Sequence, residues 1–218
     1  MNIVLILGMH RSGTSMMSQI LRALGVHMGI KLDEHYEDED FKSLNIDILS
    51  QAGGSWHQPP RQENIIKQNW SVVCIQKLIE VKSRENTLWG WKDPRMCLLI
   101  GPLYWQVLKD YNVKIVAVKR QKFSVVASLQ EREAKRGVLG IQKDNWESLV
   151  DHYNDSLCSF LSDYPEVPVY YVDYEYWTQL SLNNSCRMKL INDLCTFLNI
   201  EPKNNDKIKA YSVIRCRK

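Results

Sequence analysis

Short runs of β-branched and aliphatic residues alternate along the chain with longer segments in which apolar residues recur every three to four positions. The short runs are Ile3–Gly8, Thr87–Trp91, Lys114–Arg120 and Pro168–Asp173. Three of them are continuously apolar, which is typical of strands buried on both faces of a parallel sheet. The longer segments have the periodicity of amphipathic helices. These predicted helices are Ser15–Leu24, Phe41–Leu49, Ile65–Lys82, Cys97–Lys109, Phe123–Arg136, Trp146–Leu161 and Cys186–Leu198.

The alternation of strands and helices extends over the whole chain and favours one α/β unit. We therefore expect a single domain, residues 1–218, with three layers: a central, mostly parallel sheet flanked by helices on both faces. Leu32–Asp40 and Gly53–Arg61 are the least regular stretches and are predicted loops. In such folds ligands bind at the carboxyl ends of the strands, so the residues after each strand are the candidates for function.

Composition and charge narrow the class of protein but indicate no particular reaction or ligand. Of the 218 residues 44% are hydrophobic and 24% charged, which is ordinary for a globular protein and excludes intrinsic disorder. The net charge of +3 is too small for a general polyanion binder, so we expect no nucleic-acid partner. The longest apolar runs fall far short of the roughly 20 residues of a membrane helix. With no secretory signal at the N-terminus, we expect a cytoplasmic protein.

The cysteines and histidines show no metal-binding or disulfide pattern. The six cysteines contain no CxxC pair, and we expect them to be reduced and mostly buried. The five histidines lack the spacing of zinc ligands, so we expect no catalytic metal.

The first predicted strand leads into a glycine-bounded loop and then a helix. Gly8–Ser15 reads GMHRSGTS, which fits the nucleotide-binding pattern GxxxxGK[ST] except that Thr14 replaces the lysine. Such a loop aims backbone N–H groups and a helix dipole at one point, where an anion binds. Without the lysine that reaches the terminal phosphates of a triphosphate, the loop is predicted to bind phosphate without triphosphate hydrolysis.

This segment, GMHRSGTSMMSQIL, resembles the 5′-phosphosulfate loop of the sulfotransferases, which use 3′-phosphoadenosine 5′-phosphosulfate (PAPS) and have a P-loop-type α/β fold. The resemblance extends from Ile3 to about Leu198 and implies a P-loop NTPase-like fold. It also implies that five loop residues hold the 5′-phosphosulfate of the co-substrate. They are Arg11, Ser12, Gly13, Thr14 and Ser15.

A second segment is similar to the 3′-phosphate motif of the same family. Arg120 ends the strand KIVAVKR, and Ser128 follows eight positions later in a predicted helix. A guanidinium forks onto a phosphate, and a hydroxyl completes the phosphate's hydrogen bonds. Gln121 and Lys122 stand where the family commonly has Asp-Pro.

The second predicted strand ends in WKDPR, which resembles a segment of bacterial sulfotransferases. Pro94 extends the chain at Asp93 and ends the strand there, so Lys92, Asp93 and Arg95 are expected at the functional edge. Lys92 is the candidate donor to the sulfuryl group or its leaving oxygen, where negative charge grows. Asp93 is a candidate base or an ion-pair partner of Arg95 or Lys92.

Glu37 is the leading candidate for the general base that deprotonates the acceptor. The stretch HYEDED resembles the family's aromatic-Glu segment, with Glu37 at the position of the family glutamate. His35 and Asp93 are the alternatives, and the six acids from Asp33 to Asp40 equally fit a solvated helix start. Acceptor contacts are expected from four residues: His35, Trp56, His57 and Arg95.

The resemblance implies a PAPS-dependent sulfotransferase that uses no metal and acts on a small-molecule or glycan acceptor. We interpret Asp173, after the last strand, as structural rather than as a magnesium ligand. Arg215, Arg217 and Lys218 either close over the 3′-phosphate or form a frayed tail. Two alternatives remain open, namely a P-loop small-molecule kinase or nucleotidase, and a PAPS-binding protein without catalysis.

Overall fold

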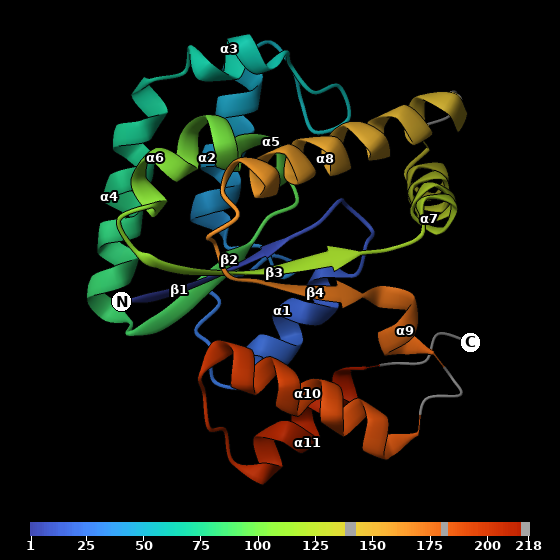
Figure 1. The fold of residues 1–218 in the computed structure, drawn as a ribbon. Coiled ribbons are helices and arrows are strands. Elements are labelled where there is room, and N and C mark those ends of the chain that lie inside the picture. The colour runs from blue at the N-terminus through green and yellow to red at the C-terminus, as the bar shows by residue number, and fades with distance from the viewer. Residues whose placement is uncertain (138–142, 180–182, 215–218) are drawn as a thin grey trace.

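The structure is a computed structural model that describes residues 1–137, 143–179 and 183–214. Its centre is a sheet of four strands: β1 (Asn2–Leu7), β2 (Leu88–Lys92), β3 (Asn112–Lys119) and β4 (Val169–Asp173). The strand order is β2-β1-β3-β4, and all three neighbouring pairs are parallel (Figure 1). Because parallel strands end at the same edge of a sheet, the four segments that follow them come together there.

Helices cover both faces of the sheet, as the alternation of elements predicts. One layer packs on the face formed by Ile3, Leu5 and Leu7 (Figure 1). It contains α2 (Glu39–Gln51), α3 (Gln62–Ile66), α4 (Trp70–Glu85), α5 (Met96–Leu99), a π-helical turn at Ile100–Tyr104, α6 (Trp105–Leu108), α7 (Lys122–Lys135) and α8 (Lys143–Asp163). The other layer packs on the face of Val4 and Ile6. It contains α1 (Thr14–Ala23), α9 (Tyr174–Thr178), α10 (Asn184–Leu198) and α11 (Asn204–Val213).

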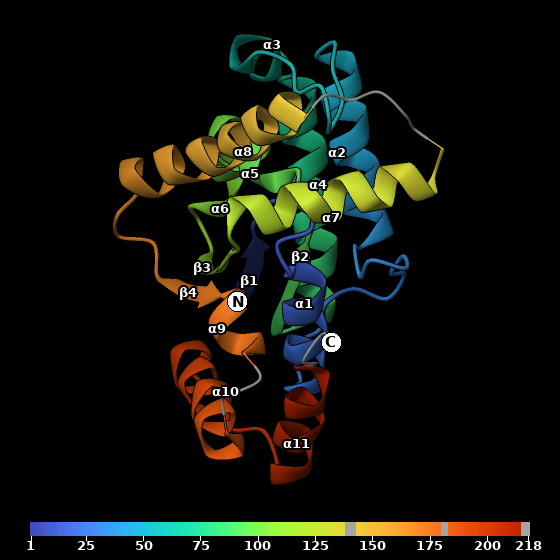
Figure 2. The same cartoon turned by 90° about the vertical axis from the view of Figure 1, so that its right-hand side faces the viewer.

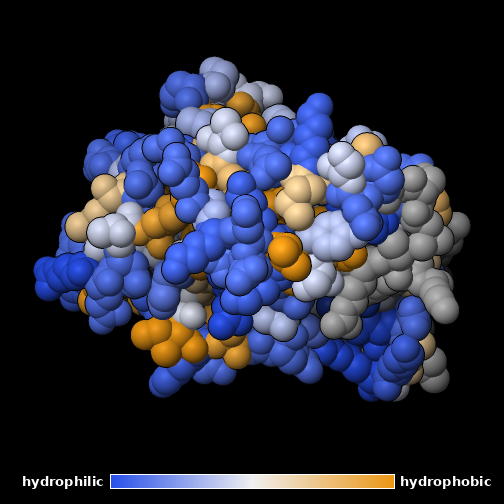
Figure 3. Space-filling model, turned by 90° about the horizontal axis from the view of Figure 1, so that it is seen from below, coloured by the Kyte–Doolittle hydropathy of each residue, from blue (hydrophilic) through white to orange (hydrophobic). Residues whose placement is uncertain are grey.

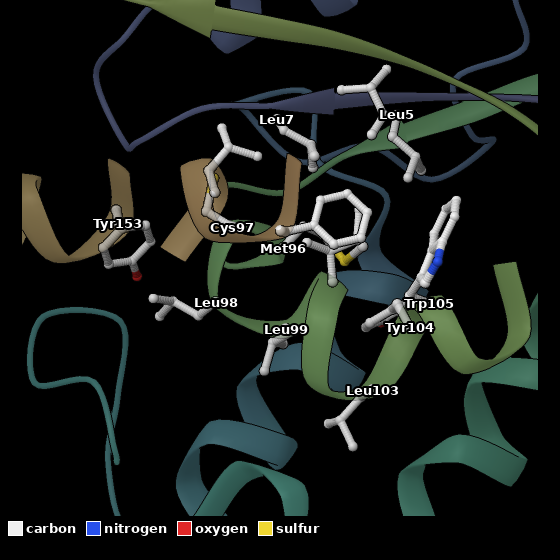
Figure 4. Packing of buried hydrophobic residues seen from close by; sticks show 14 of the residues in the cluster. Leu5, Leu7, Met96, Cys97, Leu98, Leu99, Leu103, Tyr104, Trp105 and Tyr153 are labelled. Atoms are coloured by element: carbon white, nitrogen blue, oxygen red, sulfur yellow. The ribbon is translucent and has the colours of Figure 1, made fainter. Parts of the chain in front are cut away.

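The continuous apolar run of β1 is explained by this double burial. Successive side chains of a strand point to opposite faces, so Leu5 joins one core and Val4 the other. Figure 4 shows Leu5 and Leu7 on the side of Met96 and Tyr104, which belong to the segment after β2. The prediction of a three-layer α/β unit with a parallel sheet is confirmed.

Two predicted helices are interrupted. The segment Ile65–Lys82 forms α3 and α4 with a break between Ile66 and Trp70. Both helices pack on the same core, through Ile65 of α3 and through Ile75 and Ile79 of α4. In the segment Cys97–Lys109, Pro102 lacks a backbone N–H, and the helix is interrupted there by a π-helical turn.

The prediction that the cysteines are mostly buried is wrong. Among the described residues Cys97 and Cys195 are buried, but Cys74, Cys158 and Cys186 are exposed, and all five are free thiols. The three exposed cysteines lie on the solvent sides of α4, α8 and α10, whose opposite sides face the cores.

The two views from other directions locate the carboxyl edge and an outer face. Figure 2 looks from the side toward which β3 and β4 point, where α7 crosses above α1 and α11 lies below. The face seen from below is largely hydrophilic with small hydrophobic groups, as expected of a solvent-facing helix layer (Figure 3). No helix in the described part of the chain is long and apolar enough to cross a membrane.

Candidate functional site

A cavity of about 640 Å³ opens at the carboxyl edge of the sheet. Its walls come from the loop after β1, the loop before α2, the end of β2, and the segments after β3 and β4. The lining residues are His10, Arg11, Gly13, Thr14, Ser15, Met16, Gln19, Glu34, His35, Tyr36, Glu37, Lys92, Pro94, Arg120, Arg132, Tyr174 and Val213. Segments far apart in the sequence therefore meet at the place where parallel α/β folds bind ligands.

The loop after β1 wraps the N-terminus of α1. Arg11 and Gly13 adopt left-handed conformations, with φ of 69° and 102°. Gly13 has no room for a side chain, because a Cβ would lie 2.1 Å from Cδ2 of Tyr174. The first N–H groups of a helix have no partner within the helix, and Gly13, Thr14 and Ser15 line the cavity. The loop therefore presents N–H donors and a helix dipole to an anion.

Arg11 and Arg120 connect this loop with the segment after β3. Arg11 Nε donates to Ser128 Oγ at 2.9 Å, and an Arg120 Nη donates to the Arg11 carbonyl at 2.8 Å. The Arg120 guanidinium also lies 4.8 Å from the ring centroid of Tyr174 and 3.7 Å from a Glu175 carboxylate oxygen. The two segments predicted to bind the two ends of one nucleotide are thus joined directly.

The loop before α2 presents Glu37 to the end of β2. The Asp33 carboxylate accepts hydrogen bonds from the N–H groups of His35 and Glu37 at 2.8 and 2.9 Å. Lys42 donates to the same carboxylate at 2.6 Å. Asp33 is largely shielded from solvent, which would raise its pKa, but these donors, Lys42 first among them, hold it below its ordinary value.

Glu37 lies between two cations. Lys92 Nζ donates to one of its carboxylate oxygens at 2.8 Å, and an Arg95 Nη donates to the other at 3.2 Å. Arg95 also donates to Asp93 at 2.8 Å, so the four side chains form one charged cluster. All four are buried, with Lys92 and Asp93 only 2% and 1% exposed. Buried charges require such pairing.

The cluster continues into the core through Asp93. Asn45 Nδ2 donates to Asp93 at 2.9 Å, and the Tyr104 hydroxyl donates to Asn45 Oδ1 at 2.6 Å. Burial raises the pKa of Asp93, while the positive charge of Arg95 and the Asn45 hydrogen bond act in the opposite direction. The chain of bonds anchors the end of β2 to α2 and to the π-helical turn.

A second cavity of about 220 Å³ adjoins the first. Trp56 forms part of its wall, and the Arg132 guanidinium lies 4.7 Å from a Trp56 ring centroid. Arg132 Nε pairs with Glu133 at 2.7 Å, whereas one of its Nη atoms is buried without a hydrogen-bond partner among the described residues. The Tyr153 hydroxyl fixes the Trp56 carbonyl at 2.8 Å.

His10 belongs to the walls of both cavities, and the sequence analysis did not single it out. The residue is 8% exposed, its ring lies 4.7 Å from that of Trp56 between centroids, and its Nε2 is buried without a hydrogen-bond partner among the described residues. Burial, together with the charges of Arg95, Arg132 and Lys92, lowers its pKa well below the ordinary value. The only signal in the sequence is its position inside the glycine-bounded loop.

Most of the residues predicted for the site gather at these two cavities. The larger one is lined by Arg11, Gly13, Thr14, Ser15, His35, Glu37, Lys92 and Arg120, and the smaller one by Trp56, Arg95, His35 and Glu37. Ser12, Asp93 and Ser128 are buried beside them without forming part of either wall. His57 lies outside both cavities, where it hydrogen-bonds Ser55 at 3.2 Å.

The remaining expectations concern Asp173, the C-terminal basic residues and metals. Asp173 accepts a hydrogen bond from the Tyr176 N–H at 2.8 Å and caps α9. Arg215, Arg217 and Lys218 lie outside the described residues. Within the described residues, no group of three or more His, Cys, Asp or Glu side chains is arranged to hold a metal ion.

No protein-family model matches the chain, and no curated protein matches it. Among solved structures, it is similar to the sulfotransferase domain from the curacin biosynthetic pathway, with a TM-score of 0.57 and 20% sequence identity over 96% of this chain and 77% of that chain. The chain is also similar, at a lower TM-score of 0.45 and 14% identity, to a deoxyadenosine kinase from M. mycoides with bound dATP. That match covers 90% of this chain and 100% of that chain. The first likeness establishes a fold and no activity: this chain has the P-loop-type α/β fold of a sulfotransferase domain.

Proposed function

We propose that the protein is a sulfotransferase that moves a sulfuryl group from PAPS to a hydroxyl or amine of a small-molecule or glycan acceptor. The observation that carries this proposal is the larger cavity. In it a helix N-terminus that lacks the triphosphate-binding lysine meets Arg120 and Lys92. Such a site offers donors to phosphate and sulfate oxygens at two ends of a nucleotide.

The polar atoms without partners fit a bound polyanion. Arg120 Nε and an Arg132 Nη belong to residues that line the larger cavity, and they are buried and make no hydrogen bond within the described residues, with a Glu175 carboxylate oxygen 3.7 Å from Arg120 Nε. Unsatisfied buried donors are costly, and a native protein commonly satisfies them with a ligand or water. We assign the 5′-phosphosulfate to the loop from Arg11 to Ser15, and the 3′-phosphate to Arg120 with Ser128.

PAPS would supply an activated sulfuryl group, and the chain's residues would position it and balance charge. Lys92 lines the cavity and carries the charge that stabilises the leaving oxygen. The smaller cavity, with Trp56, Arg95 and His35 in its wall, is our candidate for the acceptor site. The prediction that His57 contacts the acceptor has less support, because this residue lies outside the cavity.

One observation favours a second candidate, a nucleotide-binding protein without catalysis. Both carboxylate oxygens of Glu37 already accept hydrogen bonds from cations, and Asp93 is bound by Arg95 and Asn45. If neither carboxylate accepts a proton and no other group does, the site would bind PAPS without transferring its sulfuryl group. Transfer of label from PAPS to a panel of alcohols, phenols and sugars separates the two candidates.

The decisive binding test is calorimetric titration with 3′,5′-adenosine bisphosphate and with AMP, both in excess chelator. We expect the bisphosphate to bind much more tightly than AMP, because Arg120 and Ser128 read the 3′-phosphate. Replacing Arg120→Ala removes a charge-assisted hydrogen bond, so bisphosphate affinity should fall by about 1.5–3 kcal/mol while AMP affinity stays level.

Lys122→Ala is the matched control, since Lys122 carries the same charge two residues away. Lys122 is exposed and pairs with Asp151 at 2.9 Å, away from the cavity. Its loss should leave both affinities unchanged. Equal affinity of the wild type for AMP and the bisphosphate would contradict the 3′-phosphate assignment. If Arg120→Ala weakens AMP as much as the bisphosphate, Arg120 acts through the Arg11 carbonyl and not on the 3′-phosphate.

A further inference from the structure

We propose that the imidazole of His10 is the general base that accepts the acceptor's proton during transfer. This inference rests on the proposed function and assigns to it a residue on the nucleotide loop. It replaces Glu37 in the role for which the sequence favours that residue.

His10 stands where the two substrates must meet. Among the residues that the structure describes, five belong to the walls of both cavities, and they are His10, Glu34, His35, Glu37 and Arg132. A general base must reach the acceptor's proton while the acceptor oxygen faces the transferred group. The ring of His10 lies between the loop that would hold the donor and the cavity assigned to the acceptor.

The other possible bases in the walls of both cavities are either already hydrogen-bonded to cations or exposed to solvent. Both oxygens of Glu37 accept hydrogen bonds from Lys92 and Arg95. Glu34 is exposed, and the side chain of His35 is 38% exposed with Nε2 3.6 Å from that carboxylate. The His10 ring is instead held in place by Trp56 and, at a centroid distance of 5.9 Å, by Tyr153. A ring that is fixed by packing keeps its nitrogens in one place during proton transfer.

Burial and the charges around His10 keep its ring unprotonated, and the same causes make it a weaker base in the absence of a ligand. The charges of Arg95, Arg132, Lys92 and His35 all disfavour an imidazolium, and Glu34 and Glu37 are the acids at the same boundary. Burial acts in the same direction, so the pKa of His10 lies well below the usual 6.5 and the ring is neutral at neutral pH. A bound polyanion would offset the three cations and raise that pKa, so that the base becomes stronger when the donor is present.

The transfer step balances without any further reagent. The acceptor's O–H proton passes to a ring nitrogen of His10 as the acceptor oxygen forms its bond to sulfur. The bond between sulfur and the oxygen of the 5′-phosphate breaks, and its electron pair leaves with 3′,5′-adenosine bisphosphate. The imidazolium then returns its proton to solvent as the products depart.

The first test is an NMR titration of the histidine side chains in the full-length protein, with His10→Gln used to assign the signal. We expect the pKa of His10 to lie below the usual 6.5, and to rise by at least half a unit when 3′,5′-adenosine bisphosphate is added. A His10 signal that titrates near 6.5 and does not respond to the bisphosphate overturns the proposal.

The second test compares sulfate transfer from labelled PAPS to the acceptor panel, with water included as an acceptor. Replacing His10→Gln or His10→Asn should lower the rate about 10²–10⁴-fold and leave bisphosphate affinity within about twofold of the wild type. His152→Gln is the matched control, because His152 is exposed on α8 and outside both cavities. It should retain the wild-type rate.

The outcomes separate this proposal from the function on which it rests. If the wild type does not bind the bisphosphate, the proposed function fails. If it binds the bisphosphate but transfers sulfate to nothing, water included, the role of His10 is overturned and the nucleotide site stands. Retention of more than half the rate by both His10 variants overturns it as well, as does a loss of affinity that equals the loss of rate.

Discussion

At the scale of the residue, the buried carboxylate of Glu37 holds the side chains of Lys92 and Arg95 in place. It pairs with both Lys92 and Arg95, and together with Asp93 it balances the two cations of the buried cluster. A buried ion pair contributes little net stability, but removal of one partner leaves an uncompensated charge. Glu37 therefore keeps Lys92 in place beside the cavity, whether or not it exchanges a proton itself.

Replacing Glu37→Gln should therefore lower the free energy of unfolding by roughly 3–5 kcal/mol, as measured by urea denaturation at neutral pH. The amide keeps the shape and removes the charge. Glu39→Gln, an exposed carboxylate two residues away, should cost only a few tenths of a kcal/mol. A Glu37→Gln protein of wild-type stability whose transfer rate falls 100-fold or more would instead support Glu37 as the base.

At the scale of the element, the close contact of β1 and β2 depends on a glycine. A Cβ on Gly90 would lie 1.8 Å from the Val4 carbonyl oxygen. The flanking Trp89 and Trp91 are buried, and Trp91 stacks on Phe41 of α2 with ring centroids 4.0 Å apart. The strand that ends in Lys92 is thus held by the packing of its tryptophans and by the close approach to β1 that Gly90 allows.

The substitution Gly90→Ala should lower the free energy of unfolding by roughly 1–3 kcal/mol or more, because the strands must separate to admit the methyl group. Thermal or urea unfolding measures the change. Gly101→Ala is the control, since a Cβ there meets Phe160 at an ordinary 3.7 Å. If the two variants have equal free energies of unfolding, β2 can shift away from β1 to admit the methyl group without loss of stability, and the prediction is wrong.

A second prediction at this scale concerns the loop before α1, where a lysine can be restored at position 14. Thr14→Lys completes the GxxxxGK[ST] pattern, yet we expect no magnesium-dependent ATP hydrolysis above the Thr14→Ser control. The reason lies in another element: Asp173, the acid after β4, is committed to the cap of α9 and donates no carboxylate to the cavity. Hydrolysis of ATP by the Thr14→Lys protein, abolished by chelator, would show that Asp173 had been misjudged.

At the scale of the whole molecule, the cavity joins both helix layers to the sheet. Arg132 of α7 lies in one layer, and Val213 of α11 lies in the other. A ligand that binds there contacts segments from nearly the whole chain and stabilises them together by mass action.

We therefore expect 3′,5′-adenosine bisphosphate at about 100 times its dissociation constant to stabilise the fold by roughly 2.7 kcal/mol and to raise Tm by about 5–10 °C. Differential scanning calorimetry in excess chelator is the measurement. AMP at the same concentration should raise Tm by less, and a Tm that responds to the bisphosphate only when magnesium is present would contradict a metal-free site.

The sequence alone determined the strands, the parallel three-layer architecture and the glycine-bounded loop between β1 and α1. These features depend on local order: apolar runs, helical periodicity, and the contiguous loop from Gly8 to Ser15. It also indicated that Lys92 and Arg120 belong at one edge, because each directly follows or ends a parallel strand. The short C-terminal helix α11 was missed, since its apolar residues show little helical periodicity.

Only the tertiary structure decided how the side chains at that edge pair. Glu37 meets Lys92 across 55 positions of sequence, and Arg11 meets Ser128 across 117, so no local pattern encodes either contact. Strand order and register bring these groups together, and their burial then requires each charge to find a partner. The same packing encloses His10 between Trp56 and three cations, and this environment, not its place in the motif, makes it a neutral imidazole beside both cavities.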